Sequence, residues 1–399
     1  MKITELKLLH IEPRWLVLRI ETDAGIVGYG EPIVEGKART VDAAVRDLEP
    51  ILIGADPRRI EHIWQQAYRG GFYRGGPVLM SAISGVDQAL WDIKGKALGV
   101  PVYELLGGRV RDKVLCYAHV ARVAQTQPPS GSAYPDAQQE QDLIDIAAGA
   151  KQRVAEGFSA VKTGAPAPLG MVESPERVAS IARRFAAIRE AVGDEVGIGI
   201  DFHGRVSPPL VKLLVKALEP YNPMFFEEPV LSEHLDVMAD VAASTHIPIA
   251  TGERIFSRWG YREVLDRRAA AIIQPDLCHA GGISEVRRIA AAAETHGVGV
   301  APHNPLGPIS FAAGIQLAAC TPNFVMQEFV GRPDGRDRGE GILTEPIRID
   351  NSYVHLTDQP GLGVDVDWDR LVKDAAASDY TGDWPTPQLR HDDGSVAEW

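Results

Sequence analysis

The sequence predicts an α/β protein built on a barrel of parallel strands, preceded by a smaller α+β unit. Eight short apolar runs are separated, in most cases, by Ala-, Arg- and Glu-rich segments with helical periodicity. Strands that alternate with helices pair in parallel through right-handed crossovers. Eight such units close into a barrel more readily than they form an open sheet. The alternative is an open doubly wound sheet, but the chain lacks a Gly-rich dinucleotide fingerprint.

The α+β unit is predicted over residues 1–112. The stretch "WLVLRIETDAGIVGYGE" joins two apolar runs through the turn signal "DAG", as in a hairpin. A helix follows, with a stop signal in the Gly-Val-Pro of residues 99–101. Its apolar side chains recur at steps of three and four, and these are Ile83, Val86, Leu90, Ile93 and Ala97.

The barrel is predicted over residues 113–330. Its strands are expected at "VLCYAHV", "SAVKTG", "VGIGIDF", "MFFEEP", "PIATGE", "AAIIQPD", "GVGVAPH" and "FVMQEF". A Pro-, Ser- and Gln-rich stretch at 124–142 interrupts the pattern and is predicted to be a loop at the barrel mouth. The remaining segment, 331–399, ends in a polar tail with two Trp residues and is expected to pack back against another part of the protein.

Composition restricts the partners of the chain. It has 399 residues and a formal net charge of −13, which predicts repulsion from nucleic acids and anionic membranes. No apolar stretch approaches the roughly 20 residues of a membrane span, and the first residues lack the pattern of a secretion signal. Three Cys residues without metal-type spacing fit a reducing, cytoplasmic location.

Six consecutive predicted strands end in an ionisable side chain: Asp201, Glu227, Glu253, Asp276, His303 and Glu328. Successive members lie 26, 26, 23, 27 and 25 residues apart, the length of one strand–helix unit, so all six are expected at one rim of the barrel. A single acid at such a place is usually a helix cap or a solvated loop residue. Six together would repel one another strongly unless a cation neutralised them.

The first three of these residues are predicted to bind Mg²⁺. Asp201, Glu227 and Glu253 offer hard oxygen ligands from adjacent strands, which suit Mg²⁺ better than zinc. His203 shares a strand face with Asp201 because one residue separates them. Asp276 ends the strand before that of His303, and a carboxylate beside an imidazole raises its pKa and fixes its tautomer, as a general base requires.

This pattern resembles the enolase superfamily, in particular its mandelate-racemase-like branch. Within that branch, the stretches "YRGGFYRGGPVLMSAISGVDQALWDIKGK", "DFHGRVSPP", "FFEEPVL" and "DDGSVAEW" are similar to those of the galactonate dehydratases. The resemblance spans essentially the whole chain. It implies a modified TIM barrel, (β/α)7β, with an α+β capping domain formed by the N-terminal part and the C-terminal tail. It also implies a homo-oligomer.

The resemblance also implies roles for the strand-end residues. Asp201, Glu227 and Glu253 would hold Mg²⁺ and Asp276 would pair with His303, while Glu328 would lie beside the developing oxyanion. His303 would remove the C2 proton of a sugar acid, and His203 would protonate the hydroxyl that leaves C3. The product would be a 2-keto-3-deoxy sugar acid made from galactonate or a related aldonate. Two alternatives remain: racemisation, epimerisation or cycloisomerisation at the same site, and a non-catalytic barrel that binds sugar acids.

Substrate contacts are expected from three further residues. By resemblance, the capping domain supplies loops near Glu35 and around 72–74. Lys162 lies at the end of the second barrel strand, where galactonate dehydratases carry Lys-X-Asn, but here Gly164 replaces the Asn. His119, after the first strand, matches a substrate-contacting His of the related mannonate dehydratases. By the same resemblance, the stretch at 124–142 is longer than in the galactonate dehydratases. This insertion and Gly164 are two departures that leave the substrate identity open.

Overall fold

The computed structural model describes residues 1–120, 139–164, 167–332, 341–382, 384, 388–391 and 393–398. Most of the stretch predicted to be a loop at 124–142 lies outside this set. The chain folds as two compact units. The first unit comprises Met1–Leu115, Gly252–Tyr261 and Gln274–Thr386, and the second comprises Cys116–Thr251, Arg262–Ile273 and Pro387–Trp399.

The first unit begins with an antiparallel sheet of three strands, β1 (Ile3–Ile11), β2 (Trp15–Thr22) and β3 (Val27–Gly30). The predicted hairpin is confirmed, since β2 pairs with β3 in antiparallel register. The sheet packs on the long helix α4 (Pro77–Leu98) so closely that a Cβ at Gly30 would overlap the carbonyl oxygen of Gly85. The helix ends at Gly99, whose φ of 69° is left-handed, as the predicted stop signal requires.

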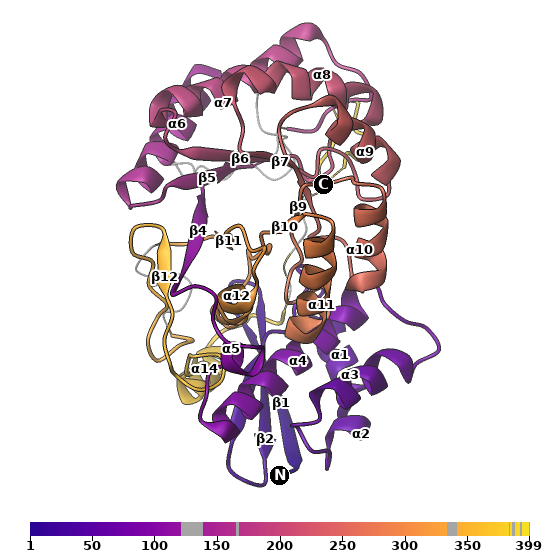
Figure 1. Ribbon diagram of the computed structural model, residues 1–399, viewed down its shortest axis with the longest axis vertical. Helices are drawn as coiled ribbons and strands as arrows, with labels where there is room; N and C mark the ends of the chain where they lie inside the picture. Colours follow the sequence, from indigo (N-terminus) through magenta and orange to yellow (C-terminus); the bar gives the residue numbers. More distant parts are fainter. Residues whose placement is uncertain are drawn as a thin grey trace. The chain divides into compact units, whose positions relative to one another are not determined.

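Other elements of the first unit come from both ends of the chain (Figure 1). They are α1 (Ala38–Arg46), α2 (Glu49–Leu52), α3 (Ile60–Arg69), α5 (Val102–Leu105), α11 (Gly282–Thr295), β10 (Gly299–Val300), α12 (Pro308–Cys320), β11 (Gln327–Phe329), β12 (Tyr353–His355) and α14 (Trp368–Ala377). Helix α10 (Ser257–Asp266) starts in this unit and continues into the second. One apolar core joins residues of the sheet, α1 and α4 to Cys278 and Leu306.

A buried carboxylate ties the antiparallel sheet to α12. Glu31 follows β3, is 1% exposed, and accepts hydrogen bonds from the backbone N–H groups of Gly307 (2.6 Å) and Ser310 (3.0 Å). These donors belong to the start of α12, where N–H groups have no partner within the helix and favour a negative charge. Glu31 therefore acts as a helix cap supplied from a distant part of the sequence.

The C-terminal segment packs on the N-terminal elements within the same unit. The backbone N–H of Leu362 donates to Asp92 on α4 at 2.9 Å, and the Arg19 guanidinium lies 5.2 Å from the ring centroid of Trp368. Further along, Arg14 lies 4.5 Å from the ring of Trp384. The α+β unit is thus built from the N-terminal part together with the C-terminal segment.

The second unit is a parallel sheet whose strands follow one another in chain order: the end of β4 (Lys113–His119), then β5 (Ala160–Thr163), β6 (Gly197–Asp201), β7 (Phe225–Glu227), β8 (Ile249–Thr251) and β9 (Ile272–Ile273). Between them run α6 (Gln139–Ala155), α7 (Pro175–Val192), α8 (Pro208–Leu218), the short η2 (Glu219–Tyr221) and α9 (Leu235–Ser244). In Figure 1 the helices α6, α7 and α8 cover the same side of β5, β6 and β7. The strands are buried nearly throughout, as expected of parallel strands.

Both parts of the predicted fold class are confirmed, because parallel strands alternate with helices and the α+β capping unit precedes them. All eight predicted barrel strands are present as β4 to β11. Within the described ranges, none of the helices combines the length and apolar character required to cross a bilayer.

Candidate active site

Two buried carboxylates lie side by side at the ends of β6 and β7 in the second unit. Asp201 is paired directly with Glu227 in the parallel register, and both side chains are almost completely buried. The Lys162 ammonium, from β5, lies 2.9 Å from Glu227 Oε1 and 3.2 Å from Asp201 Oδ2. The Lys162 ammonium therefore contacts both buried carboxylates.

His203 is held against the first of these carboxylates. Its Nε2 lies 3.0 Å from Asp201 Oδ2, and its backbone N–H donates to Asp201 Oδ1 at 2.9 Å. A left-handed φ of 50° at His203, costly for a residue with a Cβ, turns its side chain back toward Asp201. Burial raises the pKa of Asp201, but the charges of His203 and Lys162 outweigh burial and hold that pKa below its ordinary value.

The structure places the predicted substrate contacts of the second unit on neighbouring strands. His119 ends β4 directly opposite Lys162 in the parallel register. Gly164 follows β5, and a Cβ added there would meet no atom of the described residues within 4 Å. Because side chains alternate along a strand, a side chain at 164 would share the face of Lys162. The described residues thus leave room for a larger side chain at 164, where the resemblance to galactonate dehydratases leads us to expect Asn.

Asp276 and His303 form a buried pair in the first unit. His303 Nδ1 lies 2.8 Å from Asp276 Oδ2, while the other oxygen of Asp276 accepts from the backbone N–H of Cys278 at 2.6 Å. Asp276 is 0% and His303 8% exposed, so the contact is shielded from water. With Nδ1 engaged by a carboxylate, Nε2 is the nitrogen left to exchange a proton.

Two more carboxylates surround that nitrogen. Glu253 Oε2 lies 2.6 Å and Glu328 Oε2 3.9 Å from His303 Nε2, and Glu328 also accepts from the backbone N–H of Asn304 at 2.6 Å. Burial lowers the pKa of His303, but Glu253, Glu328 and Asp276 raise it more, so it lies well above the ordinary value. Without a further cation, the chain therefore favours a protonated His303.

The sequence reasoning missed His279 and Arg14. His279 is buried; its Nδ1 lies 3.8 Å from Asp276, and its Nε2 lies 3.6 Å from Glu35. Arg14 lies 3.9 Å from the other oxygen of Glu35 and donates to the Pro305 carbonyl at 3.1 Å. Only the Asp-X-X-His spacing of 276–279 could have signalled His279, and nothing local signals Arg14.

The donor set of the second unit fits a divalent cation. Asp201 and Glu227 are hard oxygen donors, and both are buried and paired in register. The third predicted ligand, Glu253, comes two residues after β8, the strand that pairs with β7. Carboxylate oxygens are the donors that Mg²⁺ prefers, so the pair of Asp201 and Glu227 fits this ion.

Comparison with known families matches most of the chain. Residues 10–107 match the N-terminal domain of the mandelate racemase / muconate lactonizing enzymes, and residues 145–370 match the enolase C-terminal domain-like family. The first match covers most of the capping unit, and the second covers all the predicted metal and catalytic positions.

Similar proteins cover the same length. Proteins named D-galactonate dehydratase from Ralstonia nicotianae and Cronobacter sakazakii are 48% and 47% identical, each over 100% of both chains. An enolase from Agrobacterium radiobacter, solved with Na and L-malate bound, has a TM-score of 0.84 at 32% identity over 100% of both chains. A member of the enolase superfamily from Salmonella Typhimurium has a TM-score of 0.82 at 31% identity, over 93% of this chain and 98% of that one. The chain belongs to the mandelate racemase / muconate lactonizing enzyme branch of the enolase superfamily.

Proposed function

We propose that the chain is a Mg²⁺-dependent acid-sugar dehydratase that converts galactonate, or a closely related aldonate, to its 2-keto-3-deoxy acid. The observation that carries the proposal is the buried pair of His303 and Asp276, with Nδ1 and Oδ2 2.8 Å apart. This pair provides an imidazole with a fixed orientation and one nitrogen available for proton transfer. Sequence identity of 48% and 47%, over the full length, to proteins named D-galactonate dehydratase supports the substrate class.

In this proposal Asp201, Glu227 and Glu253 would hold the Mg²⁺, and the ion would supply Lewis acidity. The proton beside a carboxylate is a very weak acid, so its removal requires stabilisation of the negative charge that develops. A cation held by Glu253 would also weaken the field of that carboxylate at His303, which would favour the neutral imidazole that a base requires.

The first step is proton abstraction. His303 accepts the C2 proton at Nε2, while Asp276 stabilises the imidazolium through Nδ1. Glu328 is proposed to lie beside the oxyanion of the developing enediolate. Lys162 and His119, which lie opposite each other on β4 and β5, are proposed to orient the substrate, together with Glu35 from the capping unit.

The second step is loss of the C3 hydroxyl. His203 donates a proton to that hydroxyl, the C3–O bond breaks, and the electron pair of the enediolate forms the C2–C3 double bond. Water leaves, and the resulting enol ketonises to the 2-keto-3-deoxy acid by taking up a proton at C3. The contact of His203 with Asp201 supports this role, because the carboxylate favours the protonated imidazole that a general acid needs. The proposal requires His203 and His303 to act on one substrate.

The test is a screen of the purified chain, with Mg²⁺, against C4 to C6 aldonic and uronic acids, scored by 2-keto acid formation. Turnover of galactonate or a near stereoisomer supports the proposal. If no 2-keto acid forms but solvent deuterium enters C2, the chain is a racemase, an epimerase or a cycloisomerase. If neither signal appears with any of the acids, the dehydratase proposal fails. The remaining hypothesis is then a non-catalytic barrel that binds sugar acids. Sedimentation of the same preparation tests the predicted homo-oligomer.

A further inference from the structure

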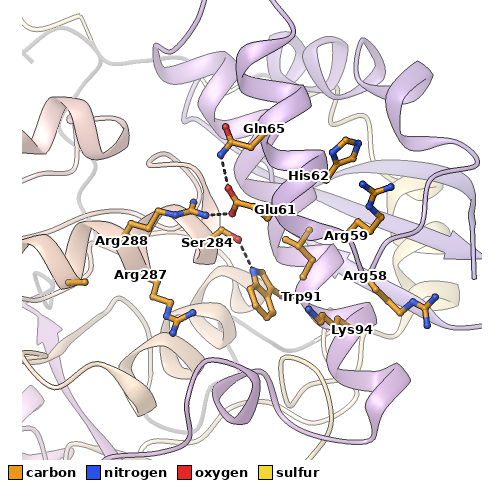
Figure 2. A pocket seen from close by; sticks show the side chains of 12 residues that line it. Arg58, Arg59, Glu61, His62, Gln65, Trp91, Lys94, Ser284, Arg287 and Arg288 are labelled. Carbon is orange, nitrogen blue, oxygen red and sulfur yellow. Dashed lines mark hydrogen bonds and ion pairs between the residues drawn. The ribbon is translucent and has the colours of Figure 1, made fainter.

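The first unit contains a pocket of about 930 Å³, and none of the residues proposed for catalysis lines it. The first turn of α3 forms one side, α11 the opposite side, and α4 the floor (Figure 2). Five of the twelve lining residues are basic, and one, Glu61, is acidic. The basic residues are Arg58, Arg59, Lys94, Arg287 and Arg288.

Three of these positive charges have no acidic partner among the described residues. Arg58 is paired with Asp56, and Arg288 with Glu61 and Glu285. In contrast, within the part of the chain that the structure describes, no carboxylate forms an ion pair with the remaining three basic side chains of the pocket: Arg59, Lys94 and Arg287. This local excess stands out in a chain whose net charge is −13. Positive charges gathered around a concave surface raise the local concentration of anions.

The floor of the pocket includes Trp91, and the Lys94 ammonium lies 5.4 Å from the centroid of its ring. Trp91 is half-buried, and its indole is fixed because Nε1 donates to Ser284 Oγ at 2.9 Å. Beside it, the first turn of α3 begins at Ile60 without a side-chain cap, so its first N–H groups have no partner within the helix. Free N–H groups at such a position favour a bound phosphate.

We propose that this pocket binds an organic phosphate that carries at least two negative charges. Arg59, Lys94 and Arg287 would pair with the phosphate oxygens, since Arg guanidinium groups match the geometry of phosphate through paired hydrogen bonds. The organic part would lie on the indole of Trp91. The pocket volume lies at the upper end of the range for small-molecule sites and exceeds what inorganic phosphate alone needs.

The test uses the full-length chain and three probes: AMP, pyrophosphate and inorganic phosphate. Calorimetry and Trp fluorescence are expected to show saturable binding of AMP and pyrophosphate, one site per chain, with affinity that falls as salt rises. AMP is expected to bind more tightly than inorganic phosphate, because its base contacts the indole. Trp91→Phe should retain phosphate binding by calorimetry and lose most of the fluorescence response.

The double variant Arg59→Ala/Arg287→Ala is expected to weaken AMP binding by about 100-fold, roughly tenfold for each charge-assisted contact. Arg262→Ala, an exposed Arg on α10 outside the pocket, is the matched control and should bind AMP normally. Circular dichroism and dehydratase turnover of each variant establish that the chain is folded.

Four results would overturn the proposal. The first is no saturable binding of any probe to the parent chain, and the second is unchanged AMP binding by the folded double variant. The third is an altered oligomeric state in the double variant without probe binding by the parent, which would make this surface a contact between copies. AMP binding no tighter than that of inorganic phosphate would exclude the organic part of the ligand.

Discussion

Glu227 combines two properties that make it informative at the scale of single residues. It is completely buried, and it receives both a Lys162 contact and the direct strand pairing with Asp201. A buried carboxylate with such neighbours can serve the fold, the metal site or both. Substitution by Gln keeps its size and removes its charge, so it tests the metal role with little change in packing.

We expect Glu227→Gln to lower the turnover of the sugar acid by more than about 100-fold while the chain remains folded, because a hard, charged ligand is lost. The measurement is 2-keto acid formation as a function of Mg²⁺ concentration. Glu263→Gln, on the exposed face of α10, is the control. Normal turnover of Glu227→Gln in excess Mg²⁺ would refute the ligand assignment.

His203→Asn should separate the two proton transfers. Dehydration is expected to fall by about 10²–10⁴-fold, the usual contribution of a general acid, while His303 continues to exchange the C2 proton. Product formation and deuterium incorporation at C2, measured in D₂O on the same sample, follow the two steps. Loss of both signals in a folded variant would show that His203 is not confined to the elimination.

Gly164→Asn is expected to lower the KM for galactonate by about two- to tenfold, because the added amide would form a hydrogen bond to the substrate. A Cβ at this position meets no atom of the described residues within 4 Å, so the side chain has room. Gly164→Ala is the matched control, since it fills part of the same space without a donor. Steady-state kinetics of both variants compare them. An equal change in KM for the Asn and Ala variants would mean that side-chain volume, and not hydrogen bonding, determines substrate affinity at this position.

The strand-end residues were accessible from the sequence, whereas the contacts of Glu35 were not. Parallel strands of similar length present their ends at one edge, so a regular spacing of Asp201, Glu227 and later residues predicts where they gather. The neighbours of Glu35, His279 and Arg14, arise from packing between segments far apart in the chain. Local pattern carries no information on such packing, and it therefore missed both residues.

At the scale of elements, α4 and α11 meet through a buried acid. Asp87 on α4 accepts a hydrogen bond at 2.9 Å from the backbone N–H of Ser284 in the first turn of α11, and a Cβ at Gly282 would collide with it. Burial raises the pKa of Asp87 to about 7, although the hydrogen bond from Ser284 opposes this. The contact between two helices therefore depends on a side chain that changes charge near neutral pH.

The sign of the pH effect follows from linkage. Asp87 has a pKa of about 7 in the folded chain and of about 4 in the unfolded chain, so between these values only the folded chain holds the proton. The contribution of Asp87 to the free energy of unfolding is therefore complete below about pH 4 and is lost as the pH rises toward 7. We expect Asp87→Asn, which cannot ionise, to become more stable relative to the parent between pH 5 and pH 8.

Thermal unfolding of Asp87→Asn and the parent at both pH values measures that difference. Asp56→Asn is the control, because the pKa of Asp56 is lowered to about 2 beside Arg58, so Asp56 stays ionised throughout this range. A difference in Tm between Asp87→Asn and the parent that is the same at pH 5 and pH 8 would contradict the raised pKa.

At the scale of the whole molecule, the periodic alternation of strands and helices was sufficient to predict the fold class, because each repeat has its own apolar signal. Which segments of the chain make up each unit was not predictable in the same way. The first unit combines the first 115 residues with segments from the second half of the chain, and the pairing depends on buried contacts such as that of Asp92 with Leu362.

Removal of divalent metal should act on the whole protein. Treatment with EDTA is expected to abolish turnover, addition of Mg²⁺ to restore it, and Mg²⁺ to raise the Tm of the parent, since a ligand that binds only the folded state stabilises it. The Glu227→Gln variant should show no such rise in Tm. Full turnover after exhaustive chelation would contradict the requirement for Mg²⁺.

The cap that Glu31 places on α12 has a consequence for synthesis on the ribosome. Its backbone partners at Gly307 are translated 276 residues later. At roughly 5–20 residues per second, that delay is on the order of tens of seconds. During this interval the Glu31 carboxylate lacks these two backbone donors, so the cap on α12 is among the last contacts of the N-terminal sheet to form.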